Sequence, residues 1–180
     1  MNYNQKYLAK ILKSNEITDT IKQNLDELTE IIPELHSMIG FEHKHPHHHL
    51  DVWNHTLLAV GMSIKDFDIR LALLLHDIGK PFSYQEEDGI RHFHGHPEVS
   101  EKISKKILKR LGIKKDKSKE ICYLIKYHDL PITEKELKKY PELTLKRYEI
   151  QRCDALSHHP DKLEKRIKYL NEVKEKIKKV

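Results

Sequence analysis

The stretch "LALLLHDIGKP", residues 71–81, decides the fold, because it sets His76 and Asp77 beside a run of apolar residues. That run predicts a buried, central helix, and Gly79 followed by Pro81 predicts where the helix ends. An ionised carboxylate in an apolar interior is unfavourable unless it is paired or coordinated. We expect no Arg or Lys on the same apolar face to neutralise Asp77. The pair therefore predicts a bound cation.

The composition extends this helix to a largely helical chain. The 180 residues include 34% charged residues but only 6 Gly and 7 Pro, and apolar residues recur at spacings of three and four. We predict an all-α fold in one domain, 1–180, with an N-terminal helical segment 1–40, a metal-binding core 41–160 and a C-terminal basic helix 161–180. No apolar run could span a bilayer and no signal peptide is recognisable. We therefore expect a soluble cytoplasmic protein with no membrane partner, in an oligomeric state that the sequence leaves open.

The net charge of +5 is unevenly spread along the chain. Residues 102–119 hold nine Lys or Arg against one acid, Asp116. A basic face of this kind could attract nucleic acid or a phosphate-bearing substrate. The simpler interpretation is a solvated helix face, and no aromatic residues are interleaved in a way that predicts base stacking.

Caps and prolines locate the expected elements. Asp51 predicts an N-cap, Pro97 occupies a favoured first-turn position, and residues 83–95 predict a polar loop. The predicted helical regions are a first one to about residue 38 that breaks at Pro33, one entered at Asp51, the quoted stretch, and 97–112, 118–129, 144–157 and 161 to the end.

Four further segments direct metal-capable side chains toward the predicted interior. His55 lies on the apolar stripe of its helix, and His96 stands at the entrance of another. His128 and Asp154 continue the apolar faces of two later helices. Taken singly, a buried histidine is more often hydrogen-bonded within a core than bound to metal. Five such segments together favour a divalent cation, and mixed imidazole and carboxylate ligands suit Fe, Mn, Co, Ni or Zn, with Mg possible.

This set resembles the H…HD…D signature of the HD-domain metal-dependent phosphohydrolase superfamily, and "HDIGKP" is similar to its central motif. The likeness is closest to the HD region of bacterial CCA-adding tRNA nucleotidyltransferases and covers about residues 25–175. It runs in order through "LTEIIPELHSMIGF", "PHHHLDVWNHTLLAV", "RLALLLHDIGKP", "HFHGHPEVSEKI", "IKYHDLP" and "QRCDALSHHP". The resemblance implies an HD-domain helical bundle with a metal site at its centre.

The polymerase head of those tRNA enzymes, with its glycine turn and Asp-x-Asp pair, has no counterpart in this sequence. The Asp-x-Asp of this chain, Asp66 and Asp68, lacks the glycine turn and precedes the HD helix. We therefore expect the HD module to stand alone, without nucleotide addition.

The resemblance implies one metal ion with four ligands, which are His55, His76, Asp77 and Asp154. Superfamily members with additional histidines bind two ions, and His96 and His128 match those positions, with Asp77 shared between the ions. If only one metal is bound, His96 and His128 become contacts to the substrate phosphate or proton donors.

By the same resemblance, the predicted catalytic residues are Asp77, Lys80 and His128. Lys80 neutralises charge on the phosphate, or else is a solvated lysine at the helix end. Asp129 either orients His128 or lies on the surface.

The predicted substrate contacts are Lys80, His48, His94 and Arg147. His48 belongs to the histidine-rich run 43–49, which we expect to form a flexible, exposed loop at the pocket rim, and Arg147 has a surface position as its simpler interpretation. We expect His158 and His159 to be exposed.

The function predicted from these residues is hydrolysis of a phosphate ester, on a small phosphoester or nucleotide, with an RNA end as a further possibility. Cyclic phosphates, 2′- and 5′-nucleotides and signalling nucleotides all fit the chemistry. One alternative is a di-iron oxygenase, because part of the superfamily uses the same six ligands to activate oxygen. The other is a non-catalytic nucleotide- or RNA-binding module that uses the basic face 102–119.

Overall fold

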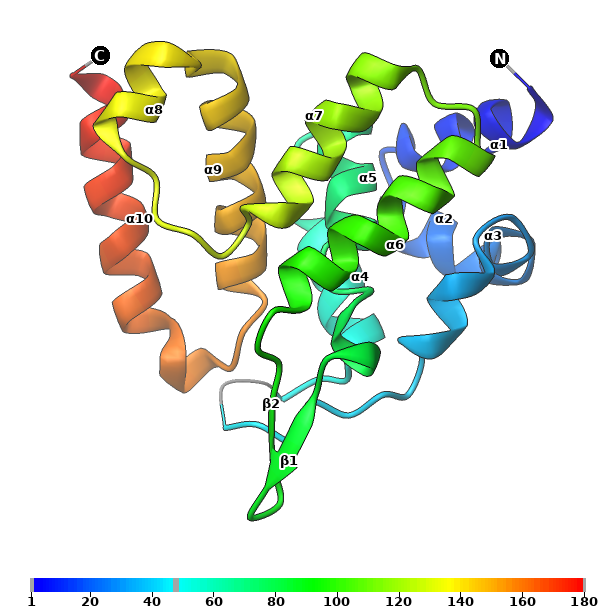
Figure 1. The fold of residues 1–180 in the computed structure, drawn as a ribbon, viewed down its shortest axis with the longest axis horizontal. Coiled ribbons are helices and arrows are strands. Elements are labelled where there is room, and N and C mark those ends of the chain that lie inside the picture. The colour runs from blue at the N-terminus through cyan, green and yellow to red at the C-terminus, as the bar shows by residue number, and fades with distance from the viewer. Residues whose placement is uncertain (1, 47–48, 180) are drawn as a thin grey trace.

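The computed structural model describes residues 2–46 and 49–179. Within this part of the chain the fold is a helical bundle, which confirms the predicted all-α class, and it adds one small hairpin (Figure 1). The helices are α1 (Tyr3–Leu12), α2 (Ile17–Gln23), α3 (Leu25–Ile31), α4 (Val52–Gly61), α5 (Phe67–Leu75), α6 (His96–Arg110), α7 (Lys115–Lys126), α8 (Glu134–Lys139), α9 (Pro141–Leu156) and α10 (Leu163–Lys178). Short 3-10 turns span Pro33–Ser37, Lys80–Phe82 and Pro160–Lys162. None of the described helices combines the length and apolarity needed to cross a bilayer.

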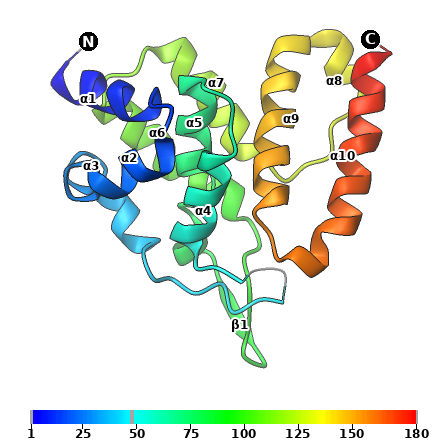
Figure 2. The ribbon, with the colours of Figure 1, turned by 180° about the vertical axis from the view of Figure 1, so that it is seen from behind.

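Helix α5 is the centre of the bundle, as the sequence predicts. Every side chain from Asp68 to Leu75 is buried, and α1, α4, α7 and α9 all pack against this helix. Figure 2 shows α4 and α5 between the N-terminal helices and the α9–α10 pair. Both charged residues of α5 have partners. Arg70 donates to the carbonyl oxygens of Leu12 and Ser14, at 2.8 and 2.7 Å, and Asp68 pairs with Lys117 and Lys146.

The α-helix ends at Leu75, four residues before the predicted end at Gly79. The chain tightens here, because the Ile78 amide donates to the Leu75 carbonyl and the Lys80 amide to the Asp77 carbonyl, each three residues back. His76 and Asp77 therefore lie in the turn at the carboxyl end of a buried helix, rather than within the helix. This position lets the two side chains point in different directions.

Helices α6 and α7 lie side by side and antiparallel, and both reach the centre with one end (Figure 1). Helix α6 starts at His96, after Gly95 with a φ of 73°, which leaves His96 buried at the helix entrance. Helix α7 ends at Lys126, so His128 follows in the next turn.

The segment 83–95, predicted to be a loop, contains an antiparallel hairpin of β1 (Gln85–Glu87) and β2 (Ile90–His92). Its two-residue turn, Asp88-Gly89, has positive φ at both positions, 51° and 76°. Asp-Gly is a favoured sequence for such a turn, and this signal identifies the hairpin.

Two more elements differ from the sequence prediction. The expected first helical region divides into α1, α2 and α3, and α8 begins at a capping box, in which the Thr133 hydroxyl and the Glu136 carboxylate satisfy each other's backbone amides. Capping boxes of this kind can be read from a sequence.

Candidate metal centre

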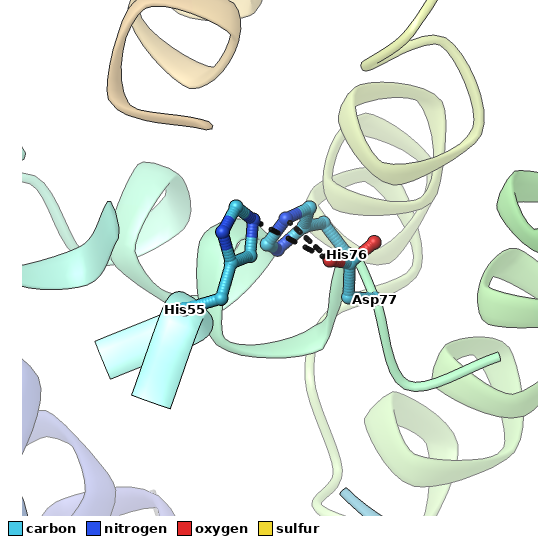
Figure 3. Close-up of side chains that lie close together, drawn as sticks. All are labelled: His55, His76 and Asp77. Atoms are coloured by element: carbon cyan, nitrogen blue, oxygen red, sulfur yellow. Dashed lines mark ion pairs between the residues drawn. The ribbon is translucent and has the colours of Figure 1, made fainter. Parts of the chain in front are cut away.

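The first group of side chains surrounds Oδ2 of Asp77 (Figure 3). His55 Nε2, from α4, lies 3.6 Å from this oxygen, and His76 Nε2 lies 3.3 Å from it. Asp154, from α9, completes the group, with Oδ1 at 2.9 Å from His55 Nε2 and 3.6 Å from His76 Nε2. The four residues predicted to hold one ion therefore converge, although 99 positions separate His55 from Asp154 in the chain.

The second group faces Oδ1 of the same carboxylate. His96 Nε2 lies 3.3 Å and His128 Nε2 lies 3.9 Å from Asp77 Oδ1. The two imidazole nitrogens are 3.2 Å apart. Asp77 thus presents one oxygen to each group, which is the arrangement that sharing between two cations requires.

Backbone carbonyls fix the orientation of three of the imidazoles. Nδ1–H of His76, His96 and His128 donates to the carbonyl oxygens of Leu73, Phe93 and Ile125, at 2.6, 2.9 and 2.6 Å. A neutral imidazole held in this way carries its lone pair on Nε2. Metal-binding histidines have the same arrangement in proteins, because the hydrogen bond sets both tautomer and ring direction.

Three buried polar atoms at the junction of the two groups form no hydrogen bond among the described residues: His76 Nε2, Asp77 Oδ1 and Asp77 Oδ2. Buried polar atoms in native proteins are nearly always hydrogen-bonded, so atoms without such bonds need an explanation. Their ion-pair contacts to neighbouring charged groups span 2.7 to 3.9 Å, and a cation would accept lone pairs from these atoms from several directions. This observation shows that the residues present fit a metal.

The electrostatics of His76 and Asp77 also fit a cation bound between them and their neighbours. Burial alone lowers the pKa of His76, but Asp77 and Asp154 outweigh burial and raise the pKa to about 9. Burial alone raises the pKa of Asp77, but the neighbouring His76 and Lys80 hold it well below its usual range. In the metal-free protein, the proton on His76 therefore supplies positive charge that a metal would otherwise supply.

Lys80 differs from the sequence prediction. Its ammonium is buried, with Nζ 2.7 Å from Asp77 Oδ2, so a lysine does lie within reach of the carboxylate. Nζ also donates to His43 Nε2, at 3.1 Å. The prediction that nothing neutralises Asp77 was wrong, because the 3-10 turn after α5 brings residue 80 back toward residue 77.

His43 was predicted to be exposed and is buried. The backbone pairing of Glu42 with Asp51 closes the loop behind it, and Nδ1–H of His43 donates to the Leu50 carbonyl at 2.8 Å. Burial and the nearby Lys80 lower the pKa of His43 to about 2, so the imidazole is neutral.

His158 was also predicted to be exposed and is buried. It donates from Nδ1 to the Asp154 carbonyl at 2.8 Å, and burial lowers its pKa to about 4. His55, Asp154 and His158 form a further group whose potential ligand atoms lie within 4.8 Å of one another. His158 follows Asp154 by four residues, about one helical turn, and this spacing could have indicated the contact from the sequence.

A cavity of about 470 Å³ opens onto both groups. Asp77, Lys80, His96, His128 and Asp154 form its inner wall. The predicted substrate contact His94 lines it too, as do the cations Arg91, Lys126 and Arg166. Asp129 is exposed at the mouth, with carboxylate oxygens 3.4 Å from His96 Nε2 and 3.5 Å from His128 Nε2. The predicted contact His48 lies outside the described residues.

Arg147 does not line this cavity. Its guanidinium is buried, pairs with Glu136 at 2.8 Å, and donates to the carbonyl oxygens of Leu130 and Pro131. These bonds join α9 to α8 and to the segment before it. We therefore correct the predicted substrate contact of Arg147, and equally its predicted surface position, to a structural role.

Comparisons with known proteins agree with the geometry. Residues 47–170 match the family model described as HD domain. The chain is 34% identical over 118 residues to the CC-adding tRNA nucleotidyltransferase of Thermus thermophilus, which is 61% of this chain and 27% of that protein. It is 34% identical over 102 residues to the A-adding tRNA nucleotidyltransferase of Deinococcus radiodurans, covering 52% and 24% of the two chains.

A third relative is the multifunctional CCA protein of Legionella pneumophila, 31% identical over 115 residues. The matched segment spans only about a quarter of each of these relatives. The family model covers more than half of this chain, in the region that holds every candidate ligand. The resemblance predicted from the sequence is thereby confirmed, and the chain belongs to the HD domain family.

Proposed function

We propose that this protein is a metal-dependent phosphohydrolase that acts on a phosphate ester of a nucleotide or of an RNA end. The observation that carries the proposal is the pair of buried Asp77 oxygens, each facing its own group of imidazoles, with the Lys80 ammonium 2.7 Å from Oδ2. In structural sites built for stability alone, buried carboxylate oxygens are satisfied by donors. Here they open onto a cavity.

The proposed ligands of the first ion are His55, His76, Asp77 and Asp154, and those of the second are Asp77, His96 and His128. This donor set suits Fe, Mn, Co, Ni or Zn, with Mg possible. When bound, divalent cations would supply Lewis-acid stabilisation of charge on the phosphoryl oxygens.

The residues of the chain itself bind and orient the substrate in this proposal. The Lys80 ammonium lines the cavity and would hold a phosphoryl oxygen. His43 Nε2 accepts a hydrogen bond from this ammonium and so helps to fix its position. Asp129, at the mouth beside His96 and His128, is placed to accept or donate a proton at the leaving group. If the second group holds no ion, His128 takes the role of proton donor.

The charge of the cavity favours an anionic substrate. Arg91, Lys126 and Arg166 line its outer part, and a cleft lined by one sign of charge attracts the opposite sign. The relatives carry names of enzymes that act on tRNA, which supports a nucleotide or RNA substrate and a cytoplasmic location. The same ligand set would suit a di-iron oxygenase, which oxygen consumption would distinguish from hydrolysis.

Elemental analysis followed by a phosphoester panel tests the proposal. We expect the purified protein to contain a transition metal and, with the right metal added, to release phosphate or open a phosphodiester. Asp77→Asn should abolish both metal content and turnover, while His159→Ala, which alters a half-buried side chain next to His158, should change neither. Oxygen consumption without phosphate release would favour the oxygenase, and saturable nucleotide binding without turnover under every metal would favour a binding module.

A further inference from the structure

A second cavity, of about 670 Å³, runs along the outer side of α6 and α7. We call it the α6–α7 groove. The lysines that line it are Lys105, Lys109, Lys115, Lys119 and Lys126, with Glu101 as the acid among the lining residues. The groove is therefore strongly cationic over its whole length.

The charge of the groove is not balanced by its surroundings. Elsewhere on α7 and α9, acids neutralise the lysines: Lys146 pairs with Glu120, and Asp68 pairs with Lys117 and Lys146. Of the groove lysines, Lys119 pairs with the exposed Asp116 at 3.4 Å. Lys105, Lys109 and Lys115 have no acidic partner within 4.0 Å in the part of the chain that the structure describes. A cationic surface left unpaired in this way favours a polyanion.

Two aromatic rings lie between the lysines. Tyr123 and Tyr127 are four residues apart on α7, and their ring centroids are 4.6 Å apart with an interplanar angle of 42°. Lys126 Nζ lies 5.8 Å from the centroid of the Tyr127 ring. No interleaved aromatics were expected among residues 102–119, but helical spacing places these two rings, which follow that segment, on the same face as the lysines. Aromatic faces in a basic groove are the surfaces on which unpaired bases stack.

The groove adjoins the metal cavity at Lys126. Lys126 lines both cavities, and Tyr127 immediately precedes the candidate ligand His128. Helix α6 begins at the candidate ligand His96 and rises roughly 20 Å to Lys109. A chain of phosphates lying along α6 and α7 would therefore lead into the cavity that holds Asp77.

We propose that the α6–α7 groove binds a single-stranded nucleic acid and directs one end of the strand into the metal cavity. Phosphates of the strand lie against Lys105, Lys109 and Lys119, and a base stacks on Tyr127. The inference rests on the proposed function only for what happens to the strand end. Binding along the groove does not require that reaction.

Fluorescence anisotropy with labelled oligouridylates tests the groove directly, with EDTA present so that turnover plays no part. We expect affinity to rise with length until the strand fills a site of about 4 to 8 nucleotides. The triple variant K105Q/K109Q/K119Q should bind a strand of about 12 nucleotides at least tenfold more weakly. The slope of log K against log salt concentration should also fall by about 2, because each phosphate contact to a single strand contributes roughly 0.7.

A matched triple variant on α10, K165Q/K168Q/K174Q, removes the same charge from exposed lysines of another helix and should leave both the affinity and the slope unchanged. Tyr127→Leu should weaken binding by about tenfold without changing the salt slope, because stacking is not ionic. Three results would overturn the proposal: no saturable binding, equal losses in the two triple variants, or polyglutamate competing as well as oligouridylate. Failure of the phosphoester panel would leave these binding results unaffected, so the two proposals fail separately.

Discussion

Asp77 is the residue on which the centre depends. Its carboxylate lies among the imidazoles of His76 and His96 and the ammonium of Lys80, and it is almost fully buried. A carboxylate in such a place stays ionised only because cationic groups surround it. The ionic state of these neighbours therefore governs both the stability of the metal-free protein and its affinity for metal.

Replacing Lys80 with Met tests whether a cation can take over the role of the lysine. Lys80→Met keeps the length of the side chain and removes the charge beside Asp77, and we expect it to destabilise the metal-free protein by about 3 kcal/mol, as breaking a buried ion pair does. With saturating Mn²⁺ the loss should shrink, because the metal then neutralises Asp77. Urea unfolding with and without Mn²⁺ measures both values.

Lys126→Met is the control for this variant, because Lys126 lines the same cavity and is only half-buried. Its effect should stay within about 0.5 kcal/mol under both conditions. An equal loss for Lys80→Met with and without Mn²⁺ would show that the ammonium and a metal do not act on the same carboxylate.

The raised pKa of His76, about 9, predicts an unusual pH dependence of metal binding. A protonated imidazole contributes stability that is complete below the unfolded pKa of about 6.5 and is lost as pH rises through 9. Metal must displace this proton, so affinity for Mn²⁺ should rise by up to tenfold per pH unit between about 6.5 and 9. The sequence alone predicts that the rise ends near pH 6.5, the usual pKa of histidine. Calorimetric titrations with Mn²⁺ across this pH range distinguish a rise in affinity that continues to pH 9 from one that ends near pH 6.5. A plateau in the affinity above pH 7 would contradict the raised pKa.

Among the elements, the turn after α5 does most to shape the centre. Gly79 lies against the first turn of α6, and a Cβ built there would be 2.5 Å from Ser100 N and 2.7 Å from His96 O. The two segments that carry Asp77 and His96 can therefore approach only because residue 79 has no side chain.

Gly79→Ala should separate these two segments. We expect a loss of about 1 to 3 kcal/mol in the free energy of unfolding, as for overpacking elsewhere, together with weaker binding of the second metal ion. Gly89→Ala, in open space at the hairpin tip but at positive φ, should cost about 1 kcal/mol and leave metal binding intact. If Gly79→Ala bound two ions as tightly as the parent protein, the close approach would not matter to the site.

Element prediction from the sequence succeeded where apolar periodicity was long. The helices around His55, His96 and Asp154 were predicted near their observed positions. It failed for short elements that local hydrogen bonds specify, such as the Asp88-Gly89 turn and the capping box at Thr133. Periodicity does not detect these elements, because they bury little apolar surface.

At the scale of the whole molecule, the centre joins parts of the chain that are far apart in sequence. Its side chains come from α4, the turn after α5, α6, the segment after α7, and α9. The sequence identified these ligand candidates by residue type and family resemblance. It did not identify His43, Lys80 and His158 as buried neighbours, because their positions depend on loop closure and on how α9 ends against α4.

Because metal bound at this junction would hold five segments together, it should stabilise the whole fold. At a free metal concentration 100 times the Kd, we expect about 2.7 kcal/mol of stabilisation and a Tm higher by about 5–10 °C. Differential scanning calorimetry with Mn²⁺ or with EDTA measures this shift. Asp77→Asn should abolish most of it, and an undiminished shift in that variant would mean that the metal binds elsewhere.

Anomalous diffraction from a crystal grown with Mn²⁺ tests the central claim most directly. The account predicts one peak among His55, His76, Asp77 and Asp154, and a second between Asp77 and the pair His96 and His128. No anomalous peak at Asp77, with Mn²⁺ bound instead at the other histidines of the chain or at none, would contradict it.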